Sequence, residues 1–527
     1  MRLFSKGKIV MLALATVLSS CESWLLEPEP AVTGLNDYFT SAESGIYAVN
    51  GAYAPLSWEY NYTYFSEFFI GDVMSDDALK GGQNISDMAD AYDMENFRTI
   101  PNNGLLLDFY RAQYQGIGRC NLALREIPNL TEEDGMTPVL QDRLMGELKF
   151  LRAYYYFRLV RVFGGVPLVD FVIESSADWQ QPRASAEAVF DLILADLEDA
   201  EQLLWSKSDY AAEDLGRATK GAAQAMLLKA NLYTHNYSEA ERWGAALMNS
   251  GEYGLLDEYG DNFTLDHENG WESIFEIQYA EDPTGDFGGS NGEGGNGYTR
   301  GTFSIILTRS RSSLLGGGWG FNKPTQNLYD EYESQDPRRD ATILNPTDTE
   351  IENPEQEIYL GSRYLNRKSG FYDENDQAID LGHPSRGPLN VKLIRYADVL
   401  LMYAEACVET GNLSSAKEAL EEVRMRARHG DNSILPEFPG YRGYADTQED
   451  LKAAIRHERR VELAMEGHRW FDLCRWGIAK EVMDAYKTSE SAEAQSHMSE
   501  FIAGKHELLP IPTQEIDLNP MEQNPGY

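Results

Sequence analysis

The chain has 527 residues, with 45 Lys and Arg against 85 Asp and Glu, which gives a formal net charge of −40. A chain of this length buries a large core without disulfide staples, and 42% hydrophobic with 25% charged residues is typical of a globular protein. Because so acidic a surface repels phosphate backbones, no nucleic-acid partner is predicted. Tyr and Trp number 30 and 9, a surplus that points to flat, amphipathic ligands.

The N-terminus has the layout of a secretory signal. Three basic residues precede an apolar stretch, residues 9–18, that is too short to span a bilayer. Small residues then lead to Cys21, as in a bacterial lipobox, so we expect cleavage before Cys21 and its acylation. An ordinary signal with a chance cysteine is the alternative. The predicted organisation is a signal peptide (1–20), a tethering leader (21–40) and a single body (41–527).

Helical patterns dominate the body. Apolar residues recur at steps of three or four from Leu140 to Leu159, and Gly164 with Gly165 marks the end of this helix. The same spacing from Leu393 to Cys407 predicts a second amphipathic helix. The segments 225–249 and 400–424 each indicate a helix, a short polar turn and a helix, with Ala at the crossing points. This spacing resembles tetratricopeptide hairpins, two ordinary helical hairpins being the alternative.

The middle of the chain has a different pattern. Phe275, Ile277 and Tyr279 alternate with polar residues, which predicts a short strand, and a second strand is predicted at 303–307. Residues 285–320 are too rich in glycine for a long helix and predict irregular loops. Long loops on a rigid helical scaffold are where binding usually lies. We therefore expect ligand-binding insertions near 57–105 and 281–325.

Two aromatic clusters fall in these loops. The candidate ligand-binding residues are Trp58, Tyr60, Tyr62, Tyr298, Trp319 and Phe321. Exposed rings form a platform for the CH face of a sugar, and neighbouring polar groups bind its hydroxyls. The alternative is that the rings pack beneath the loops.

The charged segments predict structure rather than chemistry. In the dense run 456–475, Arg459 with Glu462 and Glu466 with Arg469 are spaced as ion pairs along one helix. The acidic stretch 373–376 has oxygen ligands of the kind Ca²⁺ takes, but it lacks the EF-hand glycine, so we predict a solvated loop. No cofactor, metal ligand or catalytic residue is predicted, and the cysteines other than Cys21 are expected to be free thiols.

Several segments together resemble the SusD/RagB family of Bacteroidetes outer-membrane lipoproteins. They are the lipobox at Cys21 and, in the family's order, the segments 147–169, 227–256, 332–343, 395–406, 456–477 and 508–527. The resemblance covers nearly the whole mature chain. It implies a mostly α, SusD-like fold with tetratricopeptide-like hairpins as the scaffold, long irregular loops and a few short strands.

The resemblance also implies a function. Proteins similar to this one are lipid-anchored in the outer membrane and exposed at the cell surface. They bind oligosaccharides or polysaccharide and deliver them, without catalysis, to a SusC-like TonB-dependent transporter. The family has no residue motif for its ligand, so the candidate residues are placed by region. The net charge disfavours strongly anionic glycans unless Arg300, Arg309 and Arg311 gather locally.

Three alternatives remain at the level of sequence. A peptide or glycopeptide receptor on the same scaffold would need a groove or an exposed edge. A surface glycosidase would need two carboxyl groups at catalytic spacing. A purely structural adaptor would bind protein partners alone.

Overall fold

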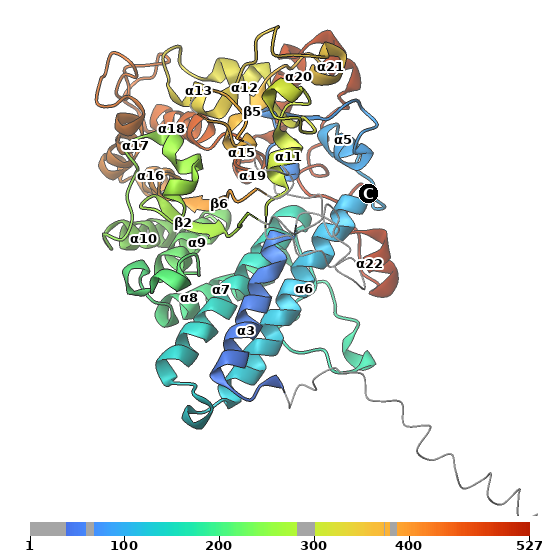
Figure 1. The fold of residues 1–527 in the computed structure, drawn as a ribbon, viewed down its shortest axis with the longest axis vertical. Coiled ribbons are helices and arrows are strands. Elements are labelled where there is room, and N and C mark those ends of the chain that lie inside the picture. Colours follow the sequence, from blue (N-terminus) through green and yellow to red (C-terminus); the bar gives the residue numbers. More distant parts are fainter. Residues whose placement is uncertain (1–37, 59–67, 282–300, 374, 380–386) are drawn as a thin grey trace, which may run out of the picture.

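The structure is a computed structural model that describes residues 38–58, 68–281, 301–373, 375–379 and 387–527. Cys21 and the leader lie outside this range. Successive long helices pack side by side to form a scaffold (Figure 1). These helices are α3 (Ala42–Tyr53), α6 (Gly104–Glu126), α7 (Pro138–Phe163), α8 (Ala186–Leu203), α9 (Lys220–Tyr233), α10 (Tyr237–Met248), α16 (Tyr396–Thr410), α17 (Leu413–Ala427) and α18 (Gln448–Glu462).

The helix predicted from Leu140 to Leu159 is the central part of α7. It begins where the Thr137 side chain accepts a hydrogen bond from the Leu140 amide and Pro138 fills the first turn. It ends at Gly164, whose φ of 70° is accessible to glycine at little cost. Eighteen of its residues are buried, because other helices pack on more than one of its faces.

The two predicted hairpins are present as α9–α10 and α16–α17, and they stack through α10 and α16. Small residues allow this close approach. A Cβ added at Gly244 of α10 would lie 2.8 Å from the Tyr403 ring of α16. The stacked hairpins confirm the mostly α fold with a tetratricopeptide-like scaffold. The predicted helix from Leu393 begins only at Tyr396, because Leu393 lies in a strand.

Short elements cover one end of the scaffold. The helices are α4 (Phe68–Gly71), α5 (Ala89–Glu95), α11 (Ser304–Thr308), α12 (Gln326–Glu331), α13 (Arg338–Thr342), α14 (Pro354–Glu357), α15 (Arg367–Gly370), α19 (Arg469–Arg475), α20 (Ala479–Ser489), α21 (Ala492–His497) and α22 (Thr513–Leu518). In Figure 1, α12, α13, α20 and α21 lie at the end opposite the lower turns of α3 and α6.

Three antiparallel strand pairs occur in the described residues. They are β1 (Ala78–Gly81) with β3 (Phe321–Pro324), β2 (Ser273–Ile277) with β6 (Val391–Arg395), and β4 (Ile343–Leu344) with β5 (Leu365–Asn366). The β2 pairing confirms the strand predicted at Phe275. The strand predicted at 303–307 is wrong, because Ser304–Thr308 forms the one-turn helix α11. A short apolar run is compatible with either structure, and the packing around it decides.

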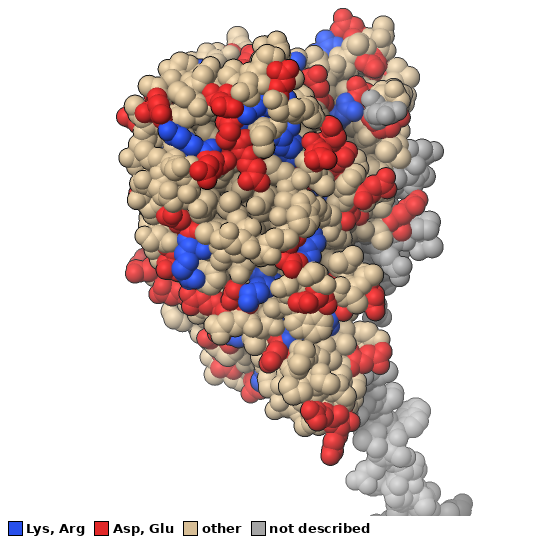
Figure 2. Space-filling model, turned by 90° about the vertical axis from the view of Figure 1, so that its left-hand side faces the viewer, with Lys and Arg blue, Asp and Glu red and all other residues tan. Residues whose placement is uncertain are grey.

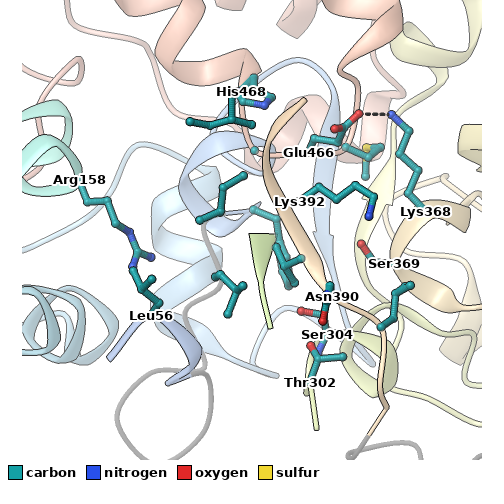
Figure 3. A pocket seen from close by; sticks show the side chains of 18 of the residues that line it. Leu56, Arg158, Thr302, Ser304, Lys368, Ser369, Asn390, Lys392, Glu466 and His468 are labelled. Atoms are coloured by element: carbon teal, nitrogen blue, oxygen red, sulfur yellow. Dashed lines mark hydrogen bonds and ion pairs between the residues drawn. The ribbon is translucent and has the colours of Figure 1, made fainter. Parts of the chain in front are cut away.

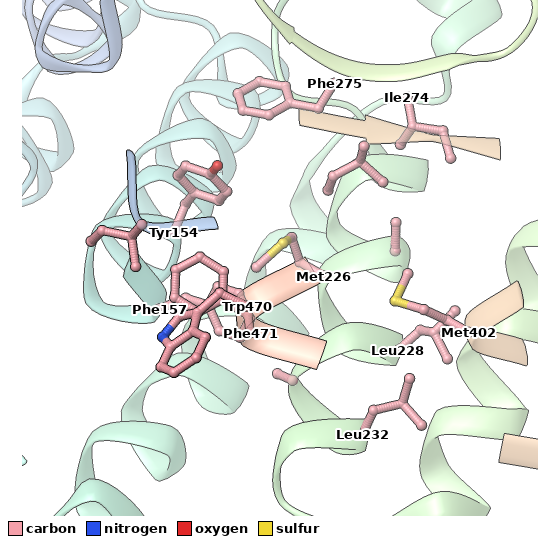
Figure 4. Packing of buried hydrophobic residues seen from close by; sticks show 14 of the residues in the cluster. Tyr154, Phe157, Met226, Leu228, Leu232, Ile274, Phe275, Met402, Trp470 and Phe471 are labelled. Atoms are coloured by element: carbon pink, nitrogen blue, oxygen red, sulfur yellow. The ribbon is translucent and has the colours of Figure 1, made fainter. Parts of the chain in front are cut away.

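The core joins the scaffold to the short elements (Figure 4). Tyr154 and Phe157 of α7 lie near Trp470 and Phe471 of α19, and Phe275 of β2 packs edge-on against Phe150 at 4.9 Å. The far C-terminal segment is thereby fixed to the first half of the chain. Among the described helices, none has the length and apolar character needed to cross a membrane.

Most of the dense charges of 456–475 form ion pairs between elements, and Asp472 with Arg475 is a pair along one helix, at 2.8 Å in α19. Helix α18 ends at Glu462, and Arg469 begins α19, so the predicted spacing does not continue. Arg459 instead pairs with Asp398 at 2.9 Å and with Asp472 at 3.1 Å.

Glu462 belongs to a buried cluster, which we call the core ion network. Its buried side chains are five cations and five carboxylates: Arg338, Arg395, Arg424, Arg426, Lys368, Asp336, Glu272, Glu458, Glu462 and Glu466. The partly exposed Glu333 also pairs with Arg424, at 3.0 Å.

Candidate ligand-binding site

A cavity of about 110 Å³ lies where α7, α9, α11, β2 and β6 meet residues 465–468. Most of its wall is apolar. The apolar lining residues include Leu56, Trp58, Phe68, Tyr154, Phe157, Met226, Phe263, Ile277, Ile305, Leu389, Leu393 and Met465. A wall of this kind, with a few convergent polar groups, is typical of a small-molecule site.

Polar groups reach the cavity from several elements, among them Arg158 and Arg161 of α7 and Lys229 of α9 (Figure 3). Thr302 and Ser304 come from the start of α11, Ser369 from α15, and Asn390 and Lys392 from the chain at β6. The Asn390 amide nitrogen donates to Glu276 at 2.9 Å, and its oxygen accepts from the Tyr279 amide at 2.6 Å. Lys392 Nζ lies 2.7 Å from Glu276 Oε1. These bonds fix the orientation of both side chains without a ligand.

Among the described residues that line this cavity, Glu466 is the one carboxylate. It pairs with Lys368 and with Arg395, each at 2.7 Å. Burial alone would raise the pKa of Glu466, but Arg395 and Lys368 lower it to about 2. Burial lowers the pKa of His468, on the same wall, to about 4. At neutral pH Glu466 is therefore an ionised structural carboxylate and His468 a neutral imidazole.

Three of the described residues that line this cavity stand close in sequence to ranges outside the description. Trp58 precedes 59–67, Thr302 follows 282–300 closely, and Leu389 follows 380–386. The Thr302 amide donates to the carbonyl of Gly387 at 2.8 Å, which joins residues that follow two of these ranges. Described residues from both predicted insertions, Trp58 and Thr302, therefore line the same cavity.

Trp58 is the predicted site residue that lines the cavity. It is partly exposed, and the Arg119 guanidinium lies 5.0 Å from its ring centre. Trp319 is also partly exposed but lies beyond α11. Its ring packs edge-on against Phe303 at 5.2 Å, and its amide donates to Ile306. Ser304 and Ile305 of α11 line the cavity, and Trp319 does not.

The prediction for Phe321 needs correction. Its side chain is 1% exposed, lies in β3 and packs edge-on against Phe69 at 6.2 Å, with Lys80 Nζ 5.3 Å from its ring centre. A ring enclosed in this way has no face open to a sugar, so we remove Phe321 from the candidate ligand residues. Tyr60, Tyr62 and Tyr298 lie outside the described residues, and their ligand role stays a prediction.

Of the arginines considered for anionic glycans, Arg309 and Arg311 are each engaged by other groups of the protein. Arg309 is buried and donates to the carbonyls of Gly370 and Phe371 at 2.6 and 2.8 Å. Arg311 pairs with Asp87 at 2.6 Å, and Arg300 lies outside the described residues. Figure 2 shows acidic side chains spread over one face of the molecule, with smaller basic groups between them.

Sequence reasoning missed Asn390, Lys392 and Ser304. Asn390 and Lys392 follow a Gly- and Pro-containing stretch at 382–388, which marks the end of a loop, and this was the available signal. Their partner Glu276 lies in β2, more than one hundred residues away, so the pairing of β2 with β6 brings them together. No group of three His, Cys, Asp or Glu in the described residues is arranged to hold a metal ion.

The fold and its loop-borne cavity define a helical-repeat binding protein, and comparisons identify the family. The model of the SusD family matches residues 384–527, and a model described as "starch-binding associating with outer membrane" matches 45–232. The chain belongs to the SusD/RagB-like family.

Relatives match over most of their length. SusD-like protein P38 of Formosa agariphila is 28% identical over 517 residues, which cover 92% of this chain and 94% of that protein. A laminarin-binding SusD-like protein of known structure is 28% identical, with a TM-score of 0.75 over 93% of this chain and all of that one. Surface glycan-binding protein A of Bacteroides thetaiotaomicron, solved in complex with laminarihexaose, is 25% identical, with a TM-score of 0.75 over 92% of this chain and 100% of that one.

Proposed function

We propose that this protein is a non-catalytic receptor that binds oligosaccharides or polysaccharide at the outer membrane and delivers them to a SusC-like TonB-dependent transporter. The observation that carries the proposal is the cavity beside Trp58, which is also lined by Thr302 and Leu389 of a SusD-like scaffold. Similar proteins that bind laminarin or laminarihexaose support a glycan as the ligand.

The chemistry of the cavity suits a sugar. The apolar wall and the partly exposed Trp58 receive CH faces, and Ser304 and Thr302 present hydroxyl groups to the sugar. The Asn390 NH₂ group already donates to Glu276 and Gln278, so Asn390 contributes its carbonyl oxygen as an acceptor. Transfer to a transporter requires release as well as capture. Millimolar to micromolar binding corresponds to about 4–8 kcal/mol, which one or two stacked rings and a few hydrogen bonds can supply.

Binding without hydrolysis agrees with the carboxylates. A glycosidase of the usual kind needs two carboxyl groups about 5 Å or about 6.5–9.5 Å apart, one of them with a raised pKa. In the described part of the cavity wall Glu466 is the lining carboxylate, and its pKa is lowered to about 2 by Arg395 and Lys368 against the effect of burial. Glu466 is therefore a poor proton donor at neutral pH.

The proposed location rests on the N-terminus and the family. An acylated Cys21 would anchor the body to the outer membrane, and one matching family model is described as associating with that membrane. Palmitate labelling of the expressed chain tests the anchor, since Cys21→Ala should abolish incorporation and Cys120→Ala should leave it unchanged. Label retained in Cys21→Ala would contradict the anchor.

The ligand is tested by affinity electrophoresis of residues 22–527 in gels that contain laminarin, starch and a panel of other neutral and acidic polysaccharides. We expect one glycan to retard the protein and Trp58→Ala to lose that retardation. Trp179→Ala is the matched control, because Trp179 is 68% exposed and does not line the cavity. Equal retardation of Trp58→Ala and the parent would contradict the site.

The electrophoresis and two further assays distinguish the proposed function from its alternatives. No retardation by any glycan would contradict the proposed function and make peptides the next ligands to test. New reducing ends in a mixture of protein and polysaccharide would contradict the proposal that the protein binds glycans without hydrolysing them. Copurification of the full lipoprotein with a TonB-dependent transporter tests the delivery step. A lipoprotein that is extracted from the membrane without any transporter bound would contradict it.

A further inference from the structure

A second hollow lies away from the cavity. Its volume is about 1040 Å³, and facing surfaces of α18 and α20 form its two long walls, so we call it the α18–α20 groove. The α18 wall carries Gln448, Lys452, Arg456 and Arg460, which follow one another at steps of four and so share one helical face. The groove and the ligand cavity share no lining residue.

The α20 wall is mostly aliphatic. Ile478, Val482 and Ala485 line it at steps of four and three, and Val408 at the end of α16 and Ala453 of α18 add to the apolar surface. Ile478 and Val482 are partly exposed and Ala485 is exposed. One wall of the groove is thus suited to aliphatic side chains and the other to charged groups.

Most charged groups in the groove already have partners. The pairs are Arg442 with Glu331 at 3.3 Å, Arg460 with Asp77 at 2.7 Å, Arg469 with Asp76 at 2.8 Å, and Lys452 with Glu409. These pairs leave no strong excess of either charge. They also hold the walls in place, so the groove is formed before any ligand arrives.

Arg456 is the exception. Within the described residues it makes no hydrogen bond or ion pair, and its Nε is buried without a partner. Its guanidinium lies 4.8 Å from the ring centre of Trp476. The nearby Glu405 and Glu409 are engaged by Arg475 and Lys452. Burial lowers the pKa of Arg456. A cation held half-buried without a carboxylate is stabilised by an incoming anion.

The remaining lining favours a peptide over a sugar. The Trp476 ring is already contacted by the guanidinium groups of Arg456 and Arg475, and Tyr486 is buried. Neither ring offers a free platform for stacking, and the third ring of the lining, the partly exposed Tyr444, packs edge-on against Tyr441 at 5.3 Å. The aliphatic wall beside a cation instead matches an acidic residue flanked by aliphatic side chains.

We propose that the α18–α20 groove docks a partner protein through a short acidic segment, whose carboxylate pairs with Arg456 and whose aliphatic side chains contact Ile478 and Val482. The α18 face from Gln448 to Arg460 is about 18 Å long, at about 1.5 Å per residue. That length accommodates about five extended residues or three helical turns. The inference is independent of glycan binding, since the groove and the cavity share no lining residue.

The test uses a phage library of random 12-residue peptides, selected on the immobilised mature chain and on its Arg456→Gln variant. Selected peptides are then synthesised and their binding is measured by fluorescence polarisation. The matched control is Arg242→Gln, because Arg242 also lies over a tryptophan, 3.9 Å from the Trp243 ring centre, and does not line the groove. Arg456 is partly exposed, and thermal melting of each variant checks that it folds.

We expect peptides with an acidic residue between aliphatic ones to be enriched on the parent. Arg456→Gln should weaken their binding about tenfold or more, Arg242→Gln should leave it unchanged, and replacing the peptide's carboxylates by amides should weaken it equally. Ala485→Glu, which places a carboxylate on the exposed opposite wall, should also weaken binding without loss of folding. Absence of enrichment, or enriched peptides that bind Arg456→Gln and Ala485→Glu as well as the parent, would overturn the proposal. Retardation by acidic polysaccharides lost in Arg456→Gln would assign the groove to a glycan and overturn it too.

Discussion

Glu462 is the residue whose loss should destabilise the core ion network most clearly. It is 0% exposed and accepts hydrogen bonds from Arg426 at 2.6 Å, Arg338 at 3.0 Å and Arg395 at 3.1 Å. In Glu462→Gln the shape is kept, but one oxygen becomes an NH₂ group that faces guanidinium donors. The buried side chains of the network are then five cations and four carboxylates instead of five and five.

The expected loss of stability in Glu462→Gln follows from the burial of this carboxylate. Removing one partner from a buried ion pair costs about 3–5 kcal/mol, because the remaining charge stays out of water without compensation. The Gln amide oxygen retains one acceptor, so we expect a loss of about 3–4 kcal/mol in the free energy of unfolding. The same substitution in an exposed pair should have little effect. Asp484→Asn is the control, since Lys480 and Asp484 are 46% and 52% exposed at 2.8 Å, and its cost should stay below about 0.5 kcal/mol.

Guanidinium unfolding, followed by circular dichroism and tryptophan fluorescence, measures both variants. The pH dependence adds an independent check. Burial would raise the pKa of Glu462, but Arg426, Arg395 and Arg338 hold it far below its ordinary value of 4.5. The stabilisation is therefore present above pH 4.5 and is lost as the pH falls, so the gap between parent and Glu462→Gln should narrow in acid. A loss no larger than that of Asp484→Asn at neutral pH would refute the reasoning.

Three further predictions concern stability and reactivity. Gly116→Ala should cost about 1–3 kcal/mol, because its Cβ would lie 2.4 Å from the Tyr155 ring, whereas Gly118→Ala on the same helix meets open space and should be neutral or stabilising by thermal melting. Burial raises the pKa of Asp72 from 3.8 to about 7, so this carboxyl favours the folded state less as the pH rises between those values. Asp72→Asn should flatten that part of the stability curve, and an unchanged slope would contradict the assignment. Burial also raises the pKa of Cys120, which should resist iodoacetamide until the protein unfolds; rapid labelling of the native chain, detected by mass spectrometry, would contradict this.

The periodic parts of the fold were predictable from sequence, because a helix that packs against neighbouring helices has apolar residues at steps of three or four along the chain. The helix at Leu140–Leu159 and the two stacked hairpins are present as expected. Short segments were not predictable in the same way. Ser304–Thr308 has the apolar composition of a strand but forms one helical turn, and Leu393 matches the spacing of α16 but pairs with β2 as part of β6. In both cases tertiary contacts outweigh local preference.

The site was predictable by region and only in part by residue. Trp58 lines the cavity, but Phe321 is a core residue, since sequence alone does not show which face of β3 packs on Phe69. Asn390 and Lys392 were missed because their roles depend on Glu276, a partner that only the folded chain brings near. The ion pairs of Arg459 and Glu462 were likewise assigned to one helix, whereas each reaches partners on other elements.

The most direct test of the central claim is a crystal structure of residues 22–527 with an oligosaccharide of the glycan that retards the protein in gels. We predict a sugar ring against Trp58 and sugar hydroxyls within hydrogen-bond distance of Asn390 or Ser304. A bound oligosaccharide that contacts none of the cavity residues would contradict the account of the site.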